Sequence, residues 1–225
     1  IDHPDQISFP DISNAIAAFM AFEWRSDTAP FDAVLRGEVV LAEPAATGMN
    51  LFYGAAGCAG CHSGPFLTDH AFHAMGAPQI GPGKAARFET HSRDEGRYRV
   101  TGNPDDLYAF RTPSLRNVAL TAPYGHAGAH SDLRDFLRAH VNPAAGLQGY
   151  DITMATLPDL PVVDVAATAD APVIAASIAA APLNVTEADL DALIAFLHTL
   201  TDPTARDGRL GVPETVPSGL PVDQP

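Results

Sequence analysis

The sequence predicts an all-α fold with long loops. Prolines and glycines, 20 and 18 of 225 residues, divide the chain into short stretches that suit helices. No long run alternates polar and apolar residues as a sheet would require. Apolar residues recur instead at helical spacing, and the 46% apolar composition is sufficient for the core of a globular domain.

Two helices can be placed in the first two thirds of the chain. The first has Asp11 as its cap, and its apolar side chains are expected to pack into the core. They are Ile12, Ile16, Phe19, Met20 and Trp24. The second is capped by Ser131 and places His140 on its apolar face. That face is completed by Leu133, Phe136 and Leu137.

A further helix is predicted near the C-terminus, with Thr186 as its cap and Asp189 three residues later. Its buried face comprises Leu190, Leu193, Ile194 and Leu197. Asp202-Pro203 ends the helix, so that His198 is a helix-end residue. Residues 208–225 contain four prolines and are expected to form an extended strap on the surface.

One motif has high chemical specificity, namely Cys58 and Cys61 followed directly by His62. C-x-x-C-H is the attachment signature of a c-type haem, in which two thioethers hold the porphyrin and the histidine takes one axial site on iron. Since the chain has only these two cysteines, a zinc site with three or four cysteines is excluded. The flanking glycines also differ from the strand and helix that surround a thioredoxin-like dithiol.

The net charge of the chain and the compartment that haem attachment requires limit the possible partners and location. Covalent haem attachment requires an oxidising compartment outside the cytoplasm, so we expect a bacterial periplasmic protein, mature, trimmed or cut from a longer one. The longest uncharged apolar run near the C-terminus, residues 173–181, is about half the length of a membrane span. A net charge of −14 disfavours nucleic acid and anionic lipid. It favours a basic partner such as a small cationic cytochrome, although solubility alone explains it equally well.

Six of the 13 basic residues lie in one window of thirty positions, 87–116, downstream of the haem motif. They are Arg87, Arg93, Arg97, Arg99, Arg111 and Arg116. Because a guanidinium group can bind a carboxylate through two parallel hydrogen bonds, one or two of them are expected to bind haem propionates, and the others to form surface ion pairs. Their spacing does not rank them.

The sixth ligand of iron decides between electron transfer and peroxide chemistry, because two strong protein ligands leave no position for peroxide. Periodicity alone favours His140 as a core histidine that is hydrogen-bonded to a carbonyl. Met75 and Met154 are the other candidates, the first only thirteen residues after His62 and the second in the loop after the helix of His140.

Two extended runs resemble the second haem segment of bacterial di-haem cytochrome c peroxidases and their MauG-like relatives. One surrounds the haem motif from Leu51 to Gly76, and the other is FRTPSLRNVALTAPY at residues 110–124, followed by His126 and Gly128. The match covers nearly the entire chain. The resemblance implies a cytochrome c-like helical haem domain. In that family a peroxide-binding haem lies in the N-terminal domain and an electron-transfer haem in the C-terminal one, and this chain is similar to the C-terminal domain.

The resemblance also implies site residues. In the family the distal ligand of the C-terminal haem, methionine or tyrosine, follows the loop histidine by fourteen residues, and counting from His126 reaches His140. This implies a bis-histidine haem, whose lower potential favours a MauG-like oxidation role. Arg116, in the second run, is the arginine that we assign to the cofactor. The carbonyls of Thr121 and Pro123 match positions that help to hold calcium between the domains.

The expected organisation is a single cytochrome c-like domain, with a lead-in helix and inter-domain passage at 1–40, a haem core at 41–205 and a tail at 206–225. One hypothesis is the electron-transfer half of a di-haem peroxidase or MauG-like oxidase. Its partners would be a second haem domain or chain that activates peroxide, and a small redox protein as donor or a protein substrate. The alternative is a stand-alone mono-haem cytochrome that transfers or senses electrons. No catalytic residue is assigned, and an exposed apolar face would favour the first hypothesis.

Overall fold

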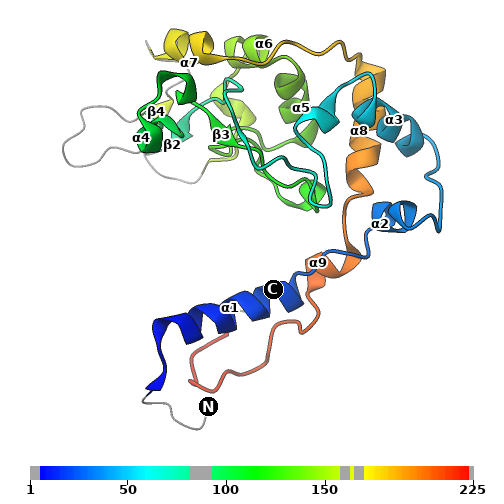
Figure 1. Cartoon of the computed structure of the whole chain (residues 1–225), viewed down its shortest axis with the longest axis vertical. Helices are drawn as coiled ribbons and strands as arrows, with labels where there is room; N and C mark the ends of the chain where they lie inside the picture. Colours follow the sequence, from blue (N-terminus) through cyan, green and yellow to red (C-terminus); the bar gives the residue numbers. More distant parts are fainter. Residues whose placement is uncertain (1–5, 82–92, 158–162, 165–169, 223–225) are drawn as a thin grey trace.

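The computed structural model describes residues 6–81, 93–157, 163–164 and 170–222. It confirms the prediction of a mainly helical fold (Figure 1). The α-helices of these residues are α1 (Phe9–Glu23), α2 (Pro30–Leu35), α3 (Ala45–Tyr53), α4 (Tyr98–Thr101), α5 (Leu133–Val141), α6 (Pro143–Gln148), α7 (Ala171–Ser177), α8 (Glu187–His198) and α9 (Pro203–Asp207). Short 3₁₀ turns are η2 (Cys58–Gly60), η3 (Pro104–Asp106), η4 (Val118–Leu120) and η5 (Ile152–Met154). None of these helices has the length and apolar composition that a membrane crossing requires.

The strands are two residues long and serve only to tie loops together. β1 (Phe72–His73) pairs antiparallel with β3 (Phe110–Arg111), so that Phe72 lies opposite Arg111. β2 (Ile80–Gly81) pairs in the same way with β4 (Val163–Asp164). The β1–β3 ladder connects the loop after the haem motif to the second of the two runs identified in the sequence.

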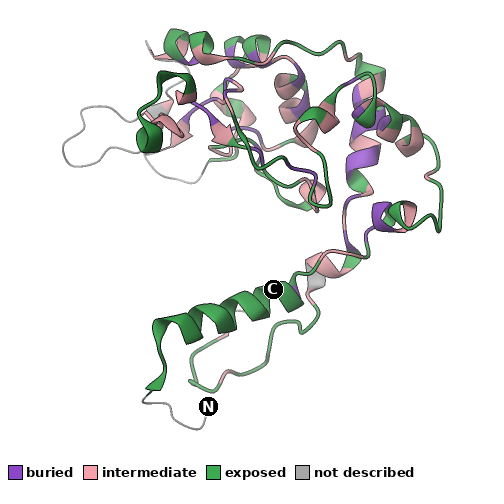
Figure 2. Ribbon diagram, viewed as in Figure 1, coloured by how far each residue is buried: buried purple, intermediate pink, exposed green. Residues whose placement is uncertain are grey.

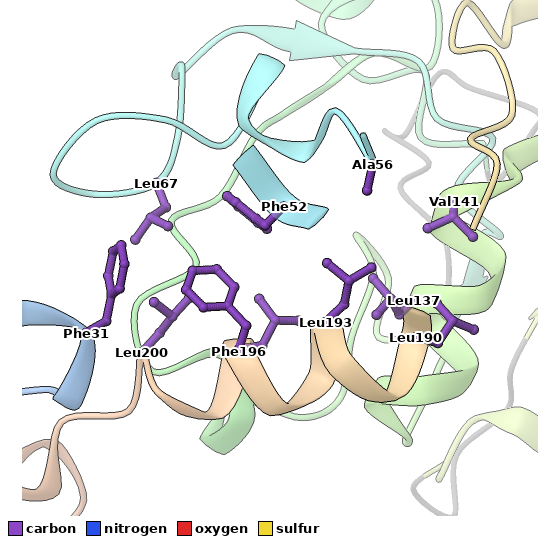
Figure 3. Close-up of a cluster of buried hydrophobic side chains, with 11 residues drawn as sticks. Phe31, Phe52, Ala56, Leu67, Leu137, Val141, Leu190, Leu193, Phe196 and Leu200 are labelled. Atoms are coloured by element: carbon purple, nitrogen blue, oxygen red, sulfur yellow. The ribbon is translucent and has the colours of Figure 1, made fainter. Parts of the chain in front are cut away.

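The core lies where α3 crosses α8, with α5 packed beside them (Figure 3). Phe196 of α8 is fully buried and packs against Phe31 and Phe52, with ring centres 5.2 and 5.1 Å away. The buried cluster comprises Phe31, Phe52, Ala56, Leu67, Leu137, Val141, Leu190, Leu193, Phe196, Leu197 and Leu200. Leu190, Leu193 and Leu197 were predicted from periodicity to be buried, whereas Ile194 is only partly buried.

Gly48 permits the close crossing of α3 and α8. A Cβ atom at this position would overlap the carbonyl of Ala192 and meet Cβ of Phe196 at 2.9 Å. Because a backbone carbonyl in a helix cannot turn away, any larger side chain would force the two helices apart.

Gly48→Ala is therefore expected to lower the free energy of unfolding by about 3 kcal/mol, despite the better helix propensity of alanine. The midpoint of guanidinium denaturation of the haem-loaded protein measures this loss. Gly60→Ala is the control, since a Cβ atom there meets no atom within 4 Å. Equal midpoints for the two variants would contradict the close crossing.

Helix α1 lies apart from this core and is exposed from Phe9 to Phe22 (Figure 2). Ile16 is 55% exposed and Phe19 is 47% exposed, so the prediction that the apolar face of this helix packs into the core was wrong. Residues 208–222 contain no helix or strand and return beside α1 (Figure 1). The buried carboxylate of Glu23 fastens them by accepting hydrogen bonds from the backbone amides of Leu210 (2.7 Å) and Gly211 (3.3 Å).

Two predicted caps differ from the observed ones. Helix α1 starts after Ser8, and Asp11 occupies the third helical position, where its carboxylate accepts the Ser8 backbone amide in a capping box. Helix α5 is capped by Asp132, whose side chain accepts the amide of Asp135, and not by Ser131. The Thr186 cap of α8 is confirmed, and so is His198 as its last residue. The division of the chain at residues 40 and 205 stays a prediction.

Candidate haem site

The haem motif forms a single tight turn. Gly57 adopts φ +66°, and η2 follows, in which the amides of Cys61 and His62 donate to the carbonyl of Cys58 at 3.2 and 2.9 Å. Gly57 suits this position because glycine has no Cβ to oppose a positive φ. The turn is short enough to bring both thiols and the imidazole to one site, as attachment to one porphyrin requires.

The two thiols do not have the properties of a redox dithiol. Burial raises the pKa of Cys58, and burial together with the charge of Asp69 raises that of Cys61. Both cysteines are free and partly buried. Catalytic dithiols instead have lowered thiol pKa values, so this pair suits covalent attachment better than thiol exchange.

His62 is oriented by one hydrogen bond. Its Nδ1 lies 3.1 Å from the carbonyl oxygen of Leu67, whose side chain is buried in the core. With Nδ1 donating to this oxygen, Nε2 carries the lone pair and is available to a metal. Burial lowers the pKa of His62, which favours the neutral imidazole that ligation requires.

His140 lies opposite His62. The ring centres of the two imidazoles are 6.2 Å apart, and their planes are inclined by 58°. Two imidazoles that donate to one metal ion from opposite sides, each at about 2 Å, have ring centres about 6 Å apart. Burial, reinforced by His62, lowers the pKa of His140 to about 4, so this ring is also neutral at pH 7. The pair therefore fits a haem iron.

The other two predicted ligands of iron lie outside α5. Met75 lies in the loop after β1, and Met154 ends η5, where its carbonyl accepts the amide of Ser131. Both side chains are partly buried. Axial ligation by His140 stays a prediction, but the arrangement of the rings favours it over either methionine.

Arg116 forms a partly buried ion pair. Its guanidinium donates to both carboxylate oxygens of Asp32 at 2.9 and 3.1 Å, and its Nε donates to the carbonyl of Pro65 at 2.7 Å. These three bonds connect α2 to the loop after the haem motif. The structure thus gives Arg116 a positioning role, and propionate binding stays a prediction.

Other predicted cofactor residues lie at the surface or beyond the described part. Arg93 pairs with Asp170, Arg97 with Asp106, and Arg111 lies 3.2 Å from the His70 ring nitrogen. Arg87 lies outside the described residues. Thr121 and Pro123, the predicted calcium ligands, are both exposed.

Three features of the site escaped sequence reasoning. The hydrogen bond between His62 and the carbonyl of Leu67 could not be predicted, because every residue has a backbone carbonyl. Asp69 and His73 form a 2.8 Å pair beside Cys61, which sequence spacing could not indicate because residues 69–73 are not helical. Phe136 stacks on the ring of His140 with ring centres 5.3 Å apart, and their i, i+4 spacing along α5 was the available signal.

Comparison with known proteins agrees with this site. No protein-family model matches the chain. The cytochrome-c peroxidase IdrP1 of Denitromonas iodatirespirans is 35% identical over 162 residues, which cover 61% of this chain and 43% of that protein. The cytochrome c551 peroxidase of Pseudomonas aeruginosa is 36% identical over 143 residues, covering 63% of this chain and 40% of that protein. The chain thus spans less than half the length of these relatives.

The fold is similar to that of a solved MauG-like protein associated with microbial copper homeostasis. The TM-score is 0.62 at 28% identity, and the match covers 91% of this chain and 58% of that one. These relatives imply a covalent c-type haem, in agreement with the Cys58, Cys61 and His62 turn and the facing His140. By sequence and by fold, the chain is related to the family of di-haem cytochrome c peroxidases and MauG-like proteins.

Proposed function

We propose that this chain holds one covalent haem c and transfers electrons, as the C-terminal half of a di-haem peroxidase or MauG-like oxidase. The observation that carries the proposal is the pairing of His62 and His140 at 6.2 Å, beside the two cysteines of the haem motif. Cys58 and Cys61 would hold the porphyrin, and the two imidazoles would occupy both axial sites. The bound haem supplies reversible one-electron chemistry.

The residues of this chain would exclude peroxide from the iron rather than activate it. His62 is oriented by the Leu67 carbonyl, and His140 blocks the opposite face. Peroxide activation would then belong to a second haem, on another domain or chain, with which this one exchanges electrons. The test is the spin state of the ferric protein with and without His140.

Helix α1 supports a partner that is itself a cytochrome-like domain. Its residues 15–20 read AIAAFM, and residues 192–197 of α8 read ALIAFL. In α8 this segment packs against α3 and is buried, whereas in α1 the corresponding Ile16 and Phe19 are about half exposed. An exposed apolar segment that is similar to a core-facing one is expected to pack on a helix that resembles α3.

The two segments offer matched substitutions. Ile16→Ala is expected to change the free energy of unfolding by less than about 0.5 kcal/mol, because its side chain is exposed. Leu193→Ala, the corresponding change in α8, is expected to cost about 2–5 kcal/mol. Guanidinium denaturation of each haem-loaded variant measures both values. A cost for Ile16→Ala as large as that for Leu193→Ala would remove this support for a second domain.

The remaining partners follow from charge and compartment. The net charge of −14 favours a small basic redox protein as electron donor, or a basic protein substrate. Covalent haem attachment favours the periplasm. The carbonyls of Thr121 and Pro123 would hold calcium only together with ligands from the second domain.

The alternative function is a stand-alone bis-histidine cytochrome. It shares the His62 and His140 pair, so the spin state does not separate the two proposals. The exposed apolar segment of α1 favours the C-terminal half of a di-haem protein, since an isolated cytochrome would leave this segment in contact with water.

A further inference from the structure

The two histidines of the site are oriented by different contacts. A ligating imidazole normally donates its second nitrogen to a carbonyl, carboxylate or water, which fixes the ring and strengthens its bond to the metal. His62 has such a bond, to the carbonyl of Leu67 at 3.1 Å. Within the described part of the chain, no protein group forms such a bond with the imidazole of His140, whose neighbours are the rings of His62 and Phe136.

A stacked ring occupies the place of that support. Phe136 precedes His140 by one turn of α5, and the two rings lie 5.3 Å apart with planes inclined by only 29°. An imidazole rotates about its bond to the metal unless something holds its plane. A flat ring against one face holds it, with an energy of about 0.5–1.5 kcal/mol for such a pair.

Phe136 is itself held on two sides. Tyr124 stacks on it at 6.0 Å, and His130 meets it nearly edge-on at 5.8 Å. Both side chains are buried, 8% and 2% exposed, so neither can move aside freely. Their backbones exchange hydrogen bonds of 2.7 and 3.2 Å across a tight loop. The loop therefore holds both side chains against Phe136.

We propose that Phe136, clamped by Tyr124 and His130, is the positioning residue that keeps His140 on the iron, and that His140 is the exchangeable one of the two axial ligands. The inference rests on the proposed function, since it requires His140 to be a ligand. Packing holds His140, whereas a hydrogen bond holds His62. Loss of the packing therefore opens the His140 side of the iron to small ligands and leaves the His62 side unchanged.

The test compares ferric, haem-loaded variants by low-temperature EPR and by the rate at which cyanide binds. Phe136→Leu removes the flat ring but keeps an apolar side chain. It is expected to shift the g-values of the low-spin signal and to accelerate cyanide binding about tenfold or more. His130→Leu removes the ring that packs edge-on against Phe136. It is also expected to shift the g-values and to accelerate cyanide binding. This second variant should fold, because Nδ1 of His130 has no hydrogen bond to lose.

The control is Phe72→Leu, which removes an aromatic ring that packs on the guanidinium of Arg97 and is outside the stack. Wild-type g-values and cyanide rates in both the Phe136 and the His130 variants, with the bis-imidazole signal intact, would overturn the inference and leave the proposed function standing. A native protein without a bis-imidazole signal would overturn the proposed function, and this inference with it.

Discussion

Replacement of His140 by alanine is expected to abolish the low-spin, bis-imidazole EPR signal of the ferric protein. The native signal requires two imidazoles on one iron, and the fold brings the rings of His62 and His140 to a centre-to-centre distance of 6.2 Å. Without His140, water or a weaker donor would take the open position, and the signal would become high-spin or of the His/Met type. Because an open position admits small ligands, the variant should also bind cyanide or peroxide faster than the native protein does.

His198→Ala is the control for this experiment. His198 ends α8 and has no part in the pairing with His62, so its replacement should leave the spectrum unchanged. A native protein that is already high-spin would contradict the ligand assignment, and would make this domain itself a candidate for peroxide chemistry. A His/Met-type low-spin signal that is the same in the native protein and in His140→Ala would point to Met75 or Met154.

Replacement of Asp202 by alanine is expected to cause a large loss of stability, about 3–5 kcal/mol in the free energy of unfolding. The carboxylate is fully buried and accepts the backbone amides of Asp27, Thr28 and Thr204 at 2.8–2.9 Å, together with two threonine hydroxyls. Its own amide donates to the Asn117 side chain at 2.7 Å. One residue thus joins the passage after α1, the start of α9 and the loop before η4. Removal of the side chain leaves these partly buried hydrogen bonds without their acceptor.

The same residue predicts an acid dependence of stability. Burial raises the pKa of Asp202, but the hydrogen bonds from Thr28 and Thr204 outweigh burial and leave it well below the ordinary value. The unfolded chain then binds this proton more readily, so stability rises with pH. The contribution is complete above about pH 4 and is lost as the pH falls further.

Guanidinium midpoints of the haem-loaded protein at pH 7 and pH 3 measure both effects. Asp202→Asn should lower the midpoint at pH 7 and reduce its dependence on acid. Asp27→Ala is the control, because that carboxylate is exposed and its ion pairs with Arg25 and Arg209 are worth less than about 1 kcal/mol. Equal losses for Asp202→Ala and Asp27→Ala would contradict the proposed role of Asp202.

The haem motif and the last long helix were predictable because their physical causes are local. A five-residue motif carries both attachment cysteines and one ligand, and its turn is closed by the amides of Cys61 and His62, which donate to the carbonyl of Cys58. The start of α8 follows from Thr186 and Asp189, because each side chain accepts a hydrogen bond from the backbone amide of the other residue. Where one polar residue neighbours another, as at Ser131 and Asp132, the sequence could not decide which of them caps the helix.

The failure at α1 has a different cause. Its apolar spacing is that of a buried helix, and its residues 15–20 match three of the six residues of the segment 192–197 in α8. Periodicity shows that a face is suited to burial, but the covering surface lies elsewhere in space or on another domain. Only the folded chain could show that Ile16 and Phe19 remain half exposed.

The sequence by itself therefore determined the helical class, the haem motif and the resemblance to a family, because each depends on residues that are close together or on long runs of identity. The tertiary structure decided which distant groups meet. It brought the ring of His140 close to that of His62 and stacked Phe136 on His140. It also paired Arg116 with Asp32, which lies 84 residues away along the chain. Such pairs depend on how helices cross and loops return, and pairwise contact across a fold leaves no periodic signal in a single sequence.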